Sequence, residues 1–257
     1  MSLPTDTTSA EYIAARNAAL ARYDLRGLDA GDPTSPCGLE YGIRISTRLT
    51  TDYRSTWRKH SIDITPMEVM DCLRAAGVRN WCLMGLHGYV GYLPMPRATQ
   101  DVDVMVPHNQ KKKAIKAISS RWPTLEKEEF EPVVRFYDPG ELDRDGNKVP
   151  VIDLMLPWGP FQETILKEHV LIDAATGARY PTAEAAIVAK YAALISPARK
   201  PSKRKYDAGD LENLIRTVHP NCDIARIQSL AGQVWEGGTE EILRFIDCAL
   251  NEKPFPV

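Results

Sequence analysis

The feature that most constrains the fold of this chain is a short segment in which two aspartates alternate with valines. Asp101 and Asp103 are each followed by a valine, Val102 and Val104, and Val106 continues the pattern. Alternation with a period of two is typical of a β-strand. The two carboxylates would therefore share one face, about 7 Å apart along the strand. A half-exposed surface strand shows the same alternation, so other residues must indicate whether the pair has a function.

A third aspartate favours a metal site over a surface strand. Asp153 lies in the middle of an apolar segment over 149–156, where an unpaired charge is costly and a cation should be near. Carboxylate oxygens are the ligands that Mg²⁺ prefers, and Mg²⁺ also pairs with substrate phosphates. The sequence therefore predicts that Asp101, Asp103 and Asp153 bind Mg²⁺ or Mn²⁺ and catalyse phosphoryl or nucleotidyl transfer.

A glycine turn before these acids adds a resemblance to a known superfamily. The order Gly85, then Arg97-Ala98-Thr99-Gln100-Asp101-Val102-Asp103, then Asp153 resembles the nucleotidyltransferases of the DNA polymerase β type. It is similar in particular to their minimal and abortive-infection (AbiEii-like) branch. The chain departs from that pattern at Leu86, where the family usually has its second glycine, and Gly88 stands where a small residue is common.

A downstream segment is similar to the helical part of the same branch. Lys190, Arg199, Asp207 and Asp210 match its pattern of Lys-x-x-Ala-Leu, Arg and Asp-x-x-Asp-Leu. The resemblance implies that Lys190 contacts the nucleotide triphosphate, whereas its apolar neighbours alone are equally typical of a lysine that extends to solvent. Asp207 and Asp210 share a helix face, and either orient Arg199 or Lys190 or favour a helix N-terminus.

Together these resemblances imply a fold and an activity. The fold would be α/β (α+β), a nucleotidyltransferase-type mixed β-sheet core with flanking helices and a C-terminal helical half. The enzyme would transfer a nucleoside monophosphate from an NTP such as ATP to an acceptor hydroxyl. In that enzyme Thr99 would also stabilise the turn before the strand, and His87 would contact phosphate or form a structural hydrogen bond. The residues implied in nucleotide binding are Gly85, Leu86, His87, Gly88, Arg97, Thr99, Lys190 and Asp210.

The sequence indicates the identity of the acceptor molecule less clearly than it indicates the reaction. A net charge of −2 does not predict a nucleic-acid partner, but five cations lie in the seven residues 199–205. They are either a solvated surface or contacts to a polyanion. Toxins of the resembled branch imply an RNA 3′ end, such as that of tRNA, and a cognate antitoxin as partner. The residues predicted to bind the nucleic acid are Arg199, Lys200, Lys203, Arg204 and Lys205.

Two alternatives stay open at this point. A small-molecule acceptor, as in aminoglycoside-modifying relatives, would need an acidic pocket for a cationic substrate. Four glutamates are candidates for that pocket: Glu126, Glu128, Glu129 and Glu131. The second alternative is a non-catalytic nucleotide-binding or interaction module of the same fold, which the departure at Leu86 makes conceivable.

The order of predicted elements divides the chain into three parts. Residues 1–60 are predicted as an N-terminal helix over 8–25 and an irregular arm over 27–48, residues 61–180 as the nucleotidyltransferase core, and residues 181–257 as a helical domain. The core is predicted to contain a capped helix beginning at Thr65, strands over 80–84, 99–106 and 131–137, a helix over 109–121, and a hairpin turn over 138–148 that leads into the strand containing Asp153. Four C-terminal helices are predicted over 182–195, 205–218, 224–234 and 239–250.

Cysteine content and hydropathy bear on the location of the chain. Five scattered cysteines fit neither a disulfide framework nor a zinc cluster. No apolar run approaches the ~20 residues of a membrane span, and the N-terminus lacks the pattern of a signal peptide. The sequence therefore predicts a cytoplasmic protein without a membrane partner.

Overall fold

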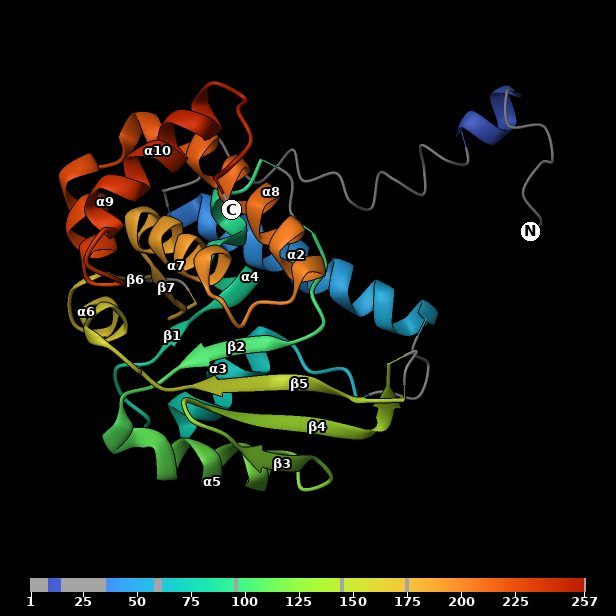
Figure 1. Ribbon diagram of the computed structural model, residues 1–257. Helices are drawn as coiled ribbons and strands as arrows, with labels where there is room; N and C mark the ends of the chain where they lie inside the picture. The colour runs from blue at the N-terminus through green and yellow to red at the C-terminus, as the bar shows by residue number, and fades with distance from the viewer. Residues whose placement is uncertain are drawn as a thin grey trace.

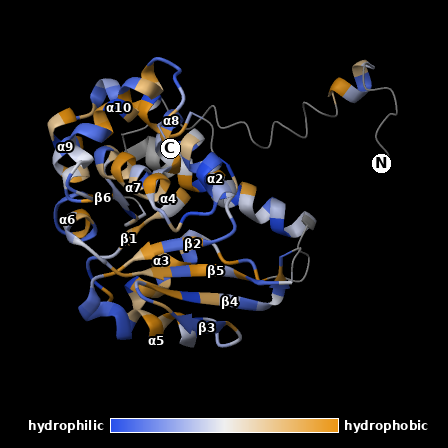
Figure 2. Ribbon diagram, in the orientation of Figure 1, coloured by the Kyte–Doolittle hydropathy of each residue, from blue (hydrophilic) through white to orange (hydrophobic). Residues whose placement is uncertain are grey.

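The computed structural model describes residues 9–14, 36–57, 62–94, 97–143, 146–173 and 176–256. Within these ranges the chain forms a five-stranded sheet, a two-stranded sheet and a set of helices around them (Figure 1). Figure 2 shows hydrophobic residues along the central strands and on helix α7 (Ala183–Ile195). The predicted fold class, a mixed sheet with flanking helices and a helical C-terminal half, is confirmed.

The main sheet has the strand order β1-β2-β5-β4-β3. Its strands are β1 (Cys82–Leu83), β2 (Val102–Met105), β5 (Lys148–Met155), β4 (Val133–Leu142) and β3 (Glu126–Glu129). Strands β2 and β5 are parallel, whereas the other neighbours are antiparallel, so the sheet is mixed. The predicted strands, including the strand that contains Asp153, are present as β1, β2, β4 and β5, the predicted hairpin joins β4 to β5, and β3 is an additional edge strand.

The predicted helices of the core are also present. Helix α3 (Pro66–Ala75) begins with the predicted capping box, in which Thr65 accepts a hydrogen bond from the Glu68 backbone. Helix α5 (Lys111–Arg121) follows the short η2 helix (His108–Gln110). Both helices cover the sheet on the side away from the C-terminal helices (Figure 1).

A second group of short elements follows the main sheet. These elements are α6 (Pro160–Glu168), β6 (Val170–Ile172) and β7 (Arg179–Pro181), and the last two pair with each other as an antiparallel sheet. No helix among the residues described here has the length and apolar character that crossing a membrane requires.

The four predicted C-terminal helices are confirmed. They are α7, α8 (Pro201–Val218), α9 (Ile224–Gly232) and α10 (Gly238–Leu250), with η3 (His219–Asn221) before α9. Helix α8 begins earlier than predicted because Pro201 occupies its first turn, where a missing N–H has no cost. The first turn of α8 therefore contains much of the basic segment.

The N-terminal part differs from the prediction. The structure has a 22-residue helix, α2 (Pro36–Trp57), where an irregular arm was predicted over 27–48. Gly42 lies inside this helix against η1 (Val90–Tyr92), and a Cβ atom on it would lie 2.4 Å from the Cα of Gly91. Glycine at position 42 therefore permits close packing of α2 against η1. The prediction of an irregular arm is wrong because this glycine serves helix packing and not a loop. The helix predicted over 8–25 is described only over residues 10–14.

Candidate active site

Three aspartates meet at the centre of the main sheet. Asp103 on β2 and Asp153 on β5 are register partners across the parallel pair, and Asp101 directly precedes β2. One carboxylate oxygen from each of the three residues lies within 4.8 Å of the others. The structure thus brings together the three acids that the sequence predicts as metal ligands.

The turn after β1 lies against one of these acids. The Met84 backbone N–H donates to the Asp103 carbonyl at 2.9 Å, which ties the turn to β2. Gly85 follows with a φ of 53°, and a Cβ atom built on it would lie 1.8 Å from Oδ2 of Asp103. Only glycine combines that backbone conformation with so close an approach. Gly85 is therefore part of the site through its missing side chain.

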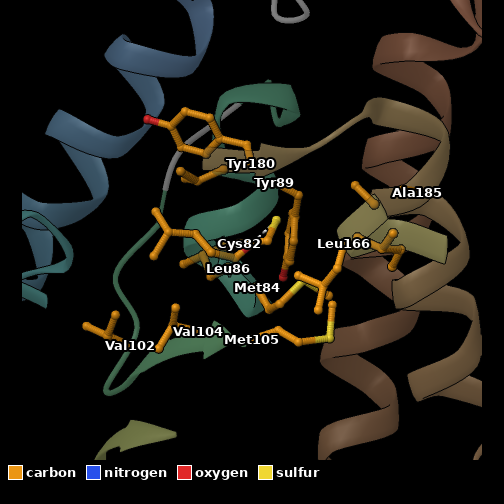
Figure 3. Close-up of a cluster of buried hydrophobic side chains, with 14 of the residues drawn as sticks. Cys82, Met84, Leu86, Tyr89, Val102, Val104, Met105, Leu166, Tyr180 and Ala185 are labelled. Atoms are coloured by element: carbon orange, nitrogen blue, oxygen red, sulfur yellow. Dashed lines mark hydrogen bonds between the residues drawn. The ribbon is translucent and has the colours of Figure 1, made fainter. Parts of the chain in front are cut away.

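The next residues form the short helix α4 (Gly85–Tyr89) and face inward. Leu86 lies within a cluster of buried side chains that includes Val102 and Val104 of β2 (Figure 3). Gly88 packs on β1, because a Cβ atom there would lie 2.6 Å from the Leu83 carbonyl oxygen. The departure at Leu86 thus places an apolar side chain in the core beneath the turn.

His87 is not brought to the acids. Its side chain is 2% exposed, and Nδ1 lies 3.5 Å from Oγ of Ser46 on α2. Burial, with the nearby charges of Arg54 and Arg97, lowers the pKa of His87 to about 3. The imidazole is therefore neutral at pH 7 and is placed for the structural role rather than for phosphate contact.

The carboxylates of the site repel one another. Burial raises the pKa of Asp103, and the charges of Asp101 and Asp153 raise it further. Burial and the charge of Asp101 raise the pKa of Asp153 to about 6, although Arg135 opposes this shift. A divalent cation at this position would offset the repulsion.

Arg135 is a member of the site that the sequence reading missed. It lies on β4 as the register partner of Asp153, and its Nε is 3.4 Å from Oδ2 of that residue. Asp103, Asp153 and Arg135 thus form a row across β2, β5 and β4. A lone arginine in a strand gives no signal in the sequence, because the pairing of β4 with β5 decides its neighbour.

The segment that leads into β2 is held by α2. Ser46 donates to the Arg97 carbonyl at 3.1 Å, the Thr99 N–H donates to Oγ1 of Thr50 at 3.2 Å, and the Arg54 side chain donates to the Gln100 carbonyl. The Thr99 hydroxyl in turn donates to Oδ1 of Asp101 at 3.0 Å. Helix α2 therefore positions the first acid, a role that no pattern in the sequence indicates.

Two buried carboxylates on α8 hold three cations beside the acids. Asp210 pairs with Arg97 at 2.7 Å and accepts from the Tyr89 hydroxyl at 2.7 Å. Asp207 pairs with Arg199 at 2.6 Å. Lys190 of α7 lies between these aspartates, with Nζ 2.9 Å from Asp207, 3.2 Å from Asp210 and 4.7 Å from the ring centre of Tyr89.

This arrangement fixes the charge of each group. Burial alone would lower the pKa of Lys190, but Tyr89 and the carboxylates of Asp210 and Asp207 more than offset it, so the pKa lies above its ordinary value. The cations beside Asp207 and Asp210 hold the pKa of each aspartate below its usual range, despite burial. Lys190 is therefore a fixed cation that points towards the site and does not extend to solvent.

A cavity of about 470 Å³ connects the acids and the cations. Its lining includes Gly85, Leu86, Tyr89, Arg97, Thr99, Asp101, Asp103, Arg135, Asp153, Lys190, Arg199, Lys203, Tyr206 and Asp207. A smaller chamber of about 190 Å³ adjoins it at Gly85 and Lys190, and its walls are largely methionine, alanine and proline. The predicted catalytic residues and most of the predicted nucleotide-binding residues therefore line one cavity.

The residues of the basic segment point in different directions. Arg199 and Lys203 line the cavity, whereas Arg204 turns back and donates to the Ser196 carbonyl at 2.8 Å. Lys200 and Lys205 are exposed. The structure thus brings two of the five predicted nucleic-acid-binding residues to the site.

The four glutamates considered for an acidic pocket lie elsewhere. Glu126, Glu128 and Glu129 are on the edge strand β3, where they pair with Lys148, Lys127 and Lys111. Glu131 lines a separate groove near Trp158. None of the four lines the cavity that contains the three aspartates.

The three aspartates fit a divalent cation. They offer only oxygen ligands, which suits Mg²⁺ or Mn²⁺ better than softer metals. The buried Oδ1 of Asp153 has no hydrogen-bond partner among the described residues, as expected of an oxygen that would bind a metal ion. Both the donor set and this unpaired atom favour a metal at this position.

Two solved structures show a distant likeness to this chain. No protein-family model and no curated protein matches the chain. The chain is similar to the structure of an antigenic nucleotidyltransferase-like protein from Paracoccidioides brasiliensis, with 12% identity over 73% of this chain and 90% of that chain and a TM-score of 0.41. It is also similar to that of terminal uridylyl transferase 4 from Trypanosoma brucei with bound GTP, with 16% identity over 86% of this chain and 74% of that chain and a TM-score of 0.30. Both TM-scores are low, so these two likenesses do not indicate the function of this chain.

Proposed function

We propose that this protein is a metal-dependent nucleotidyltransferase that moves a nucleoside monophosphate from an NTP to an acceptor hydroxyl. The observation that carries the proposal is the convergence of the Asp101, Asp103 and Asp153 carboxylates to within 4.8 Å beside a cavity lined with cations. Acids that bind metal and cations that bind phosphate are the two requirements of this reaction.

The cations on one side of the acids suit a triphosphate. Arg97, Lys190 and Arg199 all line the cavity, and Asp207 and Asp210 hold them in place. Preorganised charges of this kind stabilise developing negative charge without reorganising during the reaction. The Gly85 turn exposes backbone beside Asp103, so phosphate oxygens can approach closely there.

The acceptor hydroxyl would react on the Asp153 side. Asp101, Asp103 and Asp153 would hold the metal, which when bound neutralises phosphate charge and makes the hydroxyl easier to deprotonate. The acceptor oxygen forms a bond to the α-phosphorus, the bond to the β-phosphate oxygen breaks, and pyrophosphate leaves. Asp153 would take up the hydroxyl proton on the carboxylate oxygen that does not hold the metal.

An RNA 3′ end, such as that of tRNA, is the acceptor that we propose. The exposed Lys203 on the first turn of α8 lines the cavity, and the exposed Lys200 and Lys205 are near it in the sequence, which favours a polyanionic acceptor. The AbiEii-like motif extends the proposal to a toxin of the cytoplasm with a cognate antitoxin. A cationic small-molecule acceptor has less support, because the glutamates that it would need lie on β3 and in a separate groove. A non-catalytic module would retain the repulsion among three acids without a use for it.

Nucleotide transfer can be tested directly with purified protein, Mg²⁺, each of the four α-labelled NTPs in turn and total RNA. We expect label on RNA, and we expect Asp101→Asn to reduce it at least about 100-fold, because the substitution removes one ligand charge at constant size. Asp71→Asn is the matched control, since Asp71 lies on the surface of α3. Transfer that is equal in the two variants would refute the assigned site.

A further inference from the structure

An exposed tyrosine lies at the wall of the cavity and is not explained by the chemistry above. Tyr206 on α8 is 71% exposed, yet it lines the same cavity as the three aspartates. No side chain in the described part of the protein hydrogen-bonds to its hydroxyl. An aromatic ring that is exposed at a substrate cavity and not anchored in the core is available to stack on a ligand.

The lysine one turn before it lines the same cavity. Lys203 lines the cavity together with Tyr206, and it is close enough to Asp103 and Asp153 for its charge to act on both. The charge of Lys190, by contrast, contributes at Asp103, beside the Gly85 turn. Lys203 and Tyr206 therefore line one cavity together with Asp153 and Arg135.

The lysines of α8 are not committed to internal ion pairs. Arg97, Lys190 and Arg199 are each held by Asp207 or Asp210. In the described ranges no carboxylate pairs with Lys200, Lys203 or Lys205, the three lysines around Tyr206. Among the described residues, the cavity thus has one cation without a carboxylate partner, Lys203, beyond those that a triphosphate would meet.

We propose that Tyr206 stacks on the 3′-terminal base of a single-stranded nucleic acid, while Lys203 binds a backbone phosphate of the same strand. This proposal rests on the proposed function, because it names the substrate that supplies the acceptor hydroxyl. Ring stacking with flanking cations is how single strands are bound without sequence preference. The strand should be unpaired at its end, since moving a paired base out of a duplex costs unstacking and unpairing energy.

Binding of the strand can be measured without any NTP, and so independently of transfer. The probe is a 12-nucleotide RNA of mixed sequence that carries the fluorescent base 2-aminopurine at its 3′ end, titrated with the full-length protein. We expect quenching on binding, and we expect Tyr206→Ala to weaken binding by about 5- to 150-fold, the range measured for loss of one stacked base. Tyr206→Phe should bind like the wild type because it keeps the ring.

Two further RNA probes and two lysine variants distinguish stacking on the Tyr206 ring from general electrostatic attraction between the protein and RNA. The same RNA with 2-aminopurine in its middle should not be quenched in a Tyr206-dependent way, and a duplex with a recessed 3′ end should bind more weakly. Lys203→Ala should weaken binding and reduce its dependence on salt, whereas Lys112→Ala, an exposed lysine on α5, should not.

Two results would overturn the proposal. One is equal affinity and quenching in Tyr206→Ala and the wild type, even if nucleotide transfer is then observed. The other is a higher KM for NTP in Tyr206→Ala with unchanged RNA binding, which would assign the ring to the incoming base. Tyr206-dependent binding with no transfer from any NTP would instead retain the stacking role and reject the proposed function.

Discussion

The backbone of Gly85 lies directly against the carboxylate of Asp103. A single added carbon on Gly85 would come within 1.8 Å of Oδ2, and the residue has a positive φ of 53°. The turn after β1 and strand β2 therefore pack together so closely that there is no room for a side chain at position 85. We expect the geometry of the site to need this glycine as well as the acids.

Substitution of Gly85 tests that contact. We expect Gly85→Ala to destabilise the protein by about 2 to 5 kcal/mol, from the left-handed backbone and the overlap together, and to abolish transfer. Gly146→Ala is the matched control, because Gly146 has a φ of 79° but nothing within 4 Å of an added Cβ atom. It should cost only about 1 to 2 kcal/mol. Urea unfolding measures both, and equal losses would show that the contact has no effect.

Metal binding should be visible in stability as well as in activity. Mg²⁺ or Mn²⁺ offsets the repulsion among three carboxylates only in the folded protein, so it should raise Tm by about 5 to 10 °C at roughly 100 times its Kd. Asp103→Asn should remove most of this increase, and Asp71→Asn should leave it intact. Differential scanning calorimetry with and without EDTA provides the comparison. An increase that survives Asp103→Asn would place the metal elsewhere.

Arg135 should control the ionisation of Asp153. Its guanidinium opposes the burial that raises the pKa of Asp153 to about 6. In the metal-free protein, Arg135→Gln should therefore raise that pKa further, and more of the carboxyl would be protonated at neutral pH. A pH titration followed by ¹³C NMR of the side-chain carboxyl carbon of Asp153 measures the midpoint of its ionisation. Lys127→Gln, on β3, is a control that should not move it, and an unchanged midpoint in Arg135→Gln would remove Arg135 from the site.

Loss of Lys190 should affect both stability and nucleotide affinity. Lys190→Met leaves Asp207 and Asp210 with one cation each, so we expect a loss of about 1 to 3 kcal/mol in the free energy of unfolding and a higher KM for NTP. The pair of Lys253 and Asp247 is exposed. Lys253→Met should therefore change the stability little. An unchanged KM in Lys190→Met would show that Lys190 is only structural.

Buried His87 should make the protein sensitive to acid. Its pKa is about 3 in the folded protein and about 6.5 when unfolded, so the unfolded state binds the extra proton between these values. The contribution of His87 to stability is therefore complete above pH 6.5 and is lost as the pH falls towards 3. Chemical denaturation across this range should show a shallower decline for His87→Gln than for the wild type. Parallel declines in the two proteins would contradict the assignment.

Local patterns in the sequence determined much of the fold. The alternation around Asp101 and Asp103 predicts β2 because a period of two is a property of the strand itself. The capping box at Thr65 and the apolar spacing of the C-terminal helices likewise depend on neighbours within a few residues. These elements appear in the structure close to their predicted bounds.

Tertiary structure alone decided which residues are neighbours at the site. Arg135 meets Asp153 only through the register of β4 on β5, and Ser46 and Thr50 reach the Arg97–Thr99 segment only because α2 packs on it. The same packing explains Gly42, which in the sequence looks like a loop residue.

The chemistry of the site therefore has two origins. The sequence by itself supplied the three acids, the glycine turn and Lys190, since each belongs to a local motif. The folded chain supplied their distances, their protonation and the state of His87, because burial and ion pairing depend on segments that are far apart in the sequence. Local conformation can be deduced from near neighbours, whereas electrostatics in a site is set by everything packed around it.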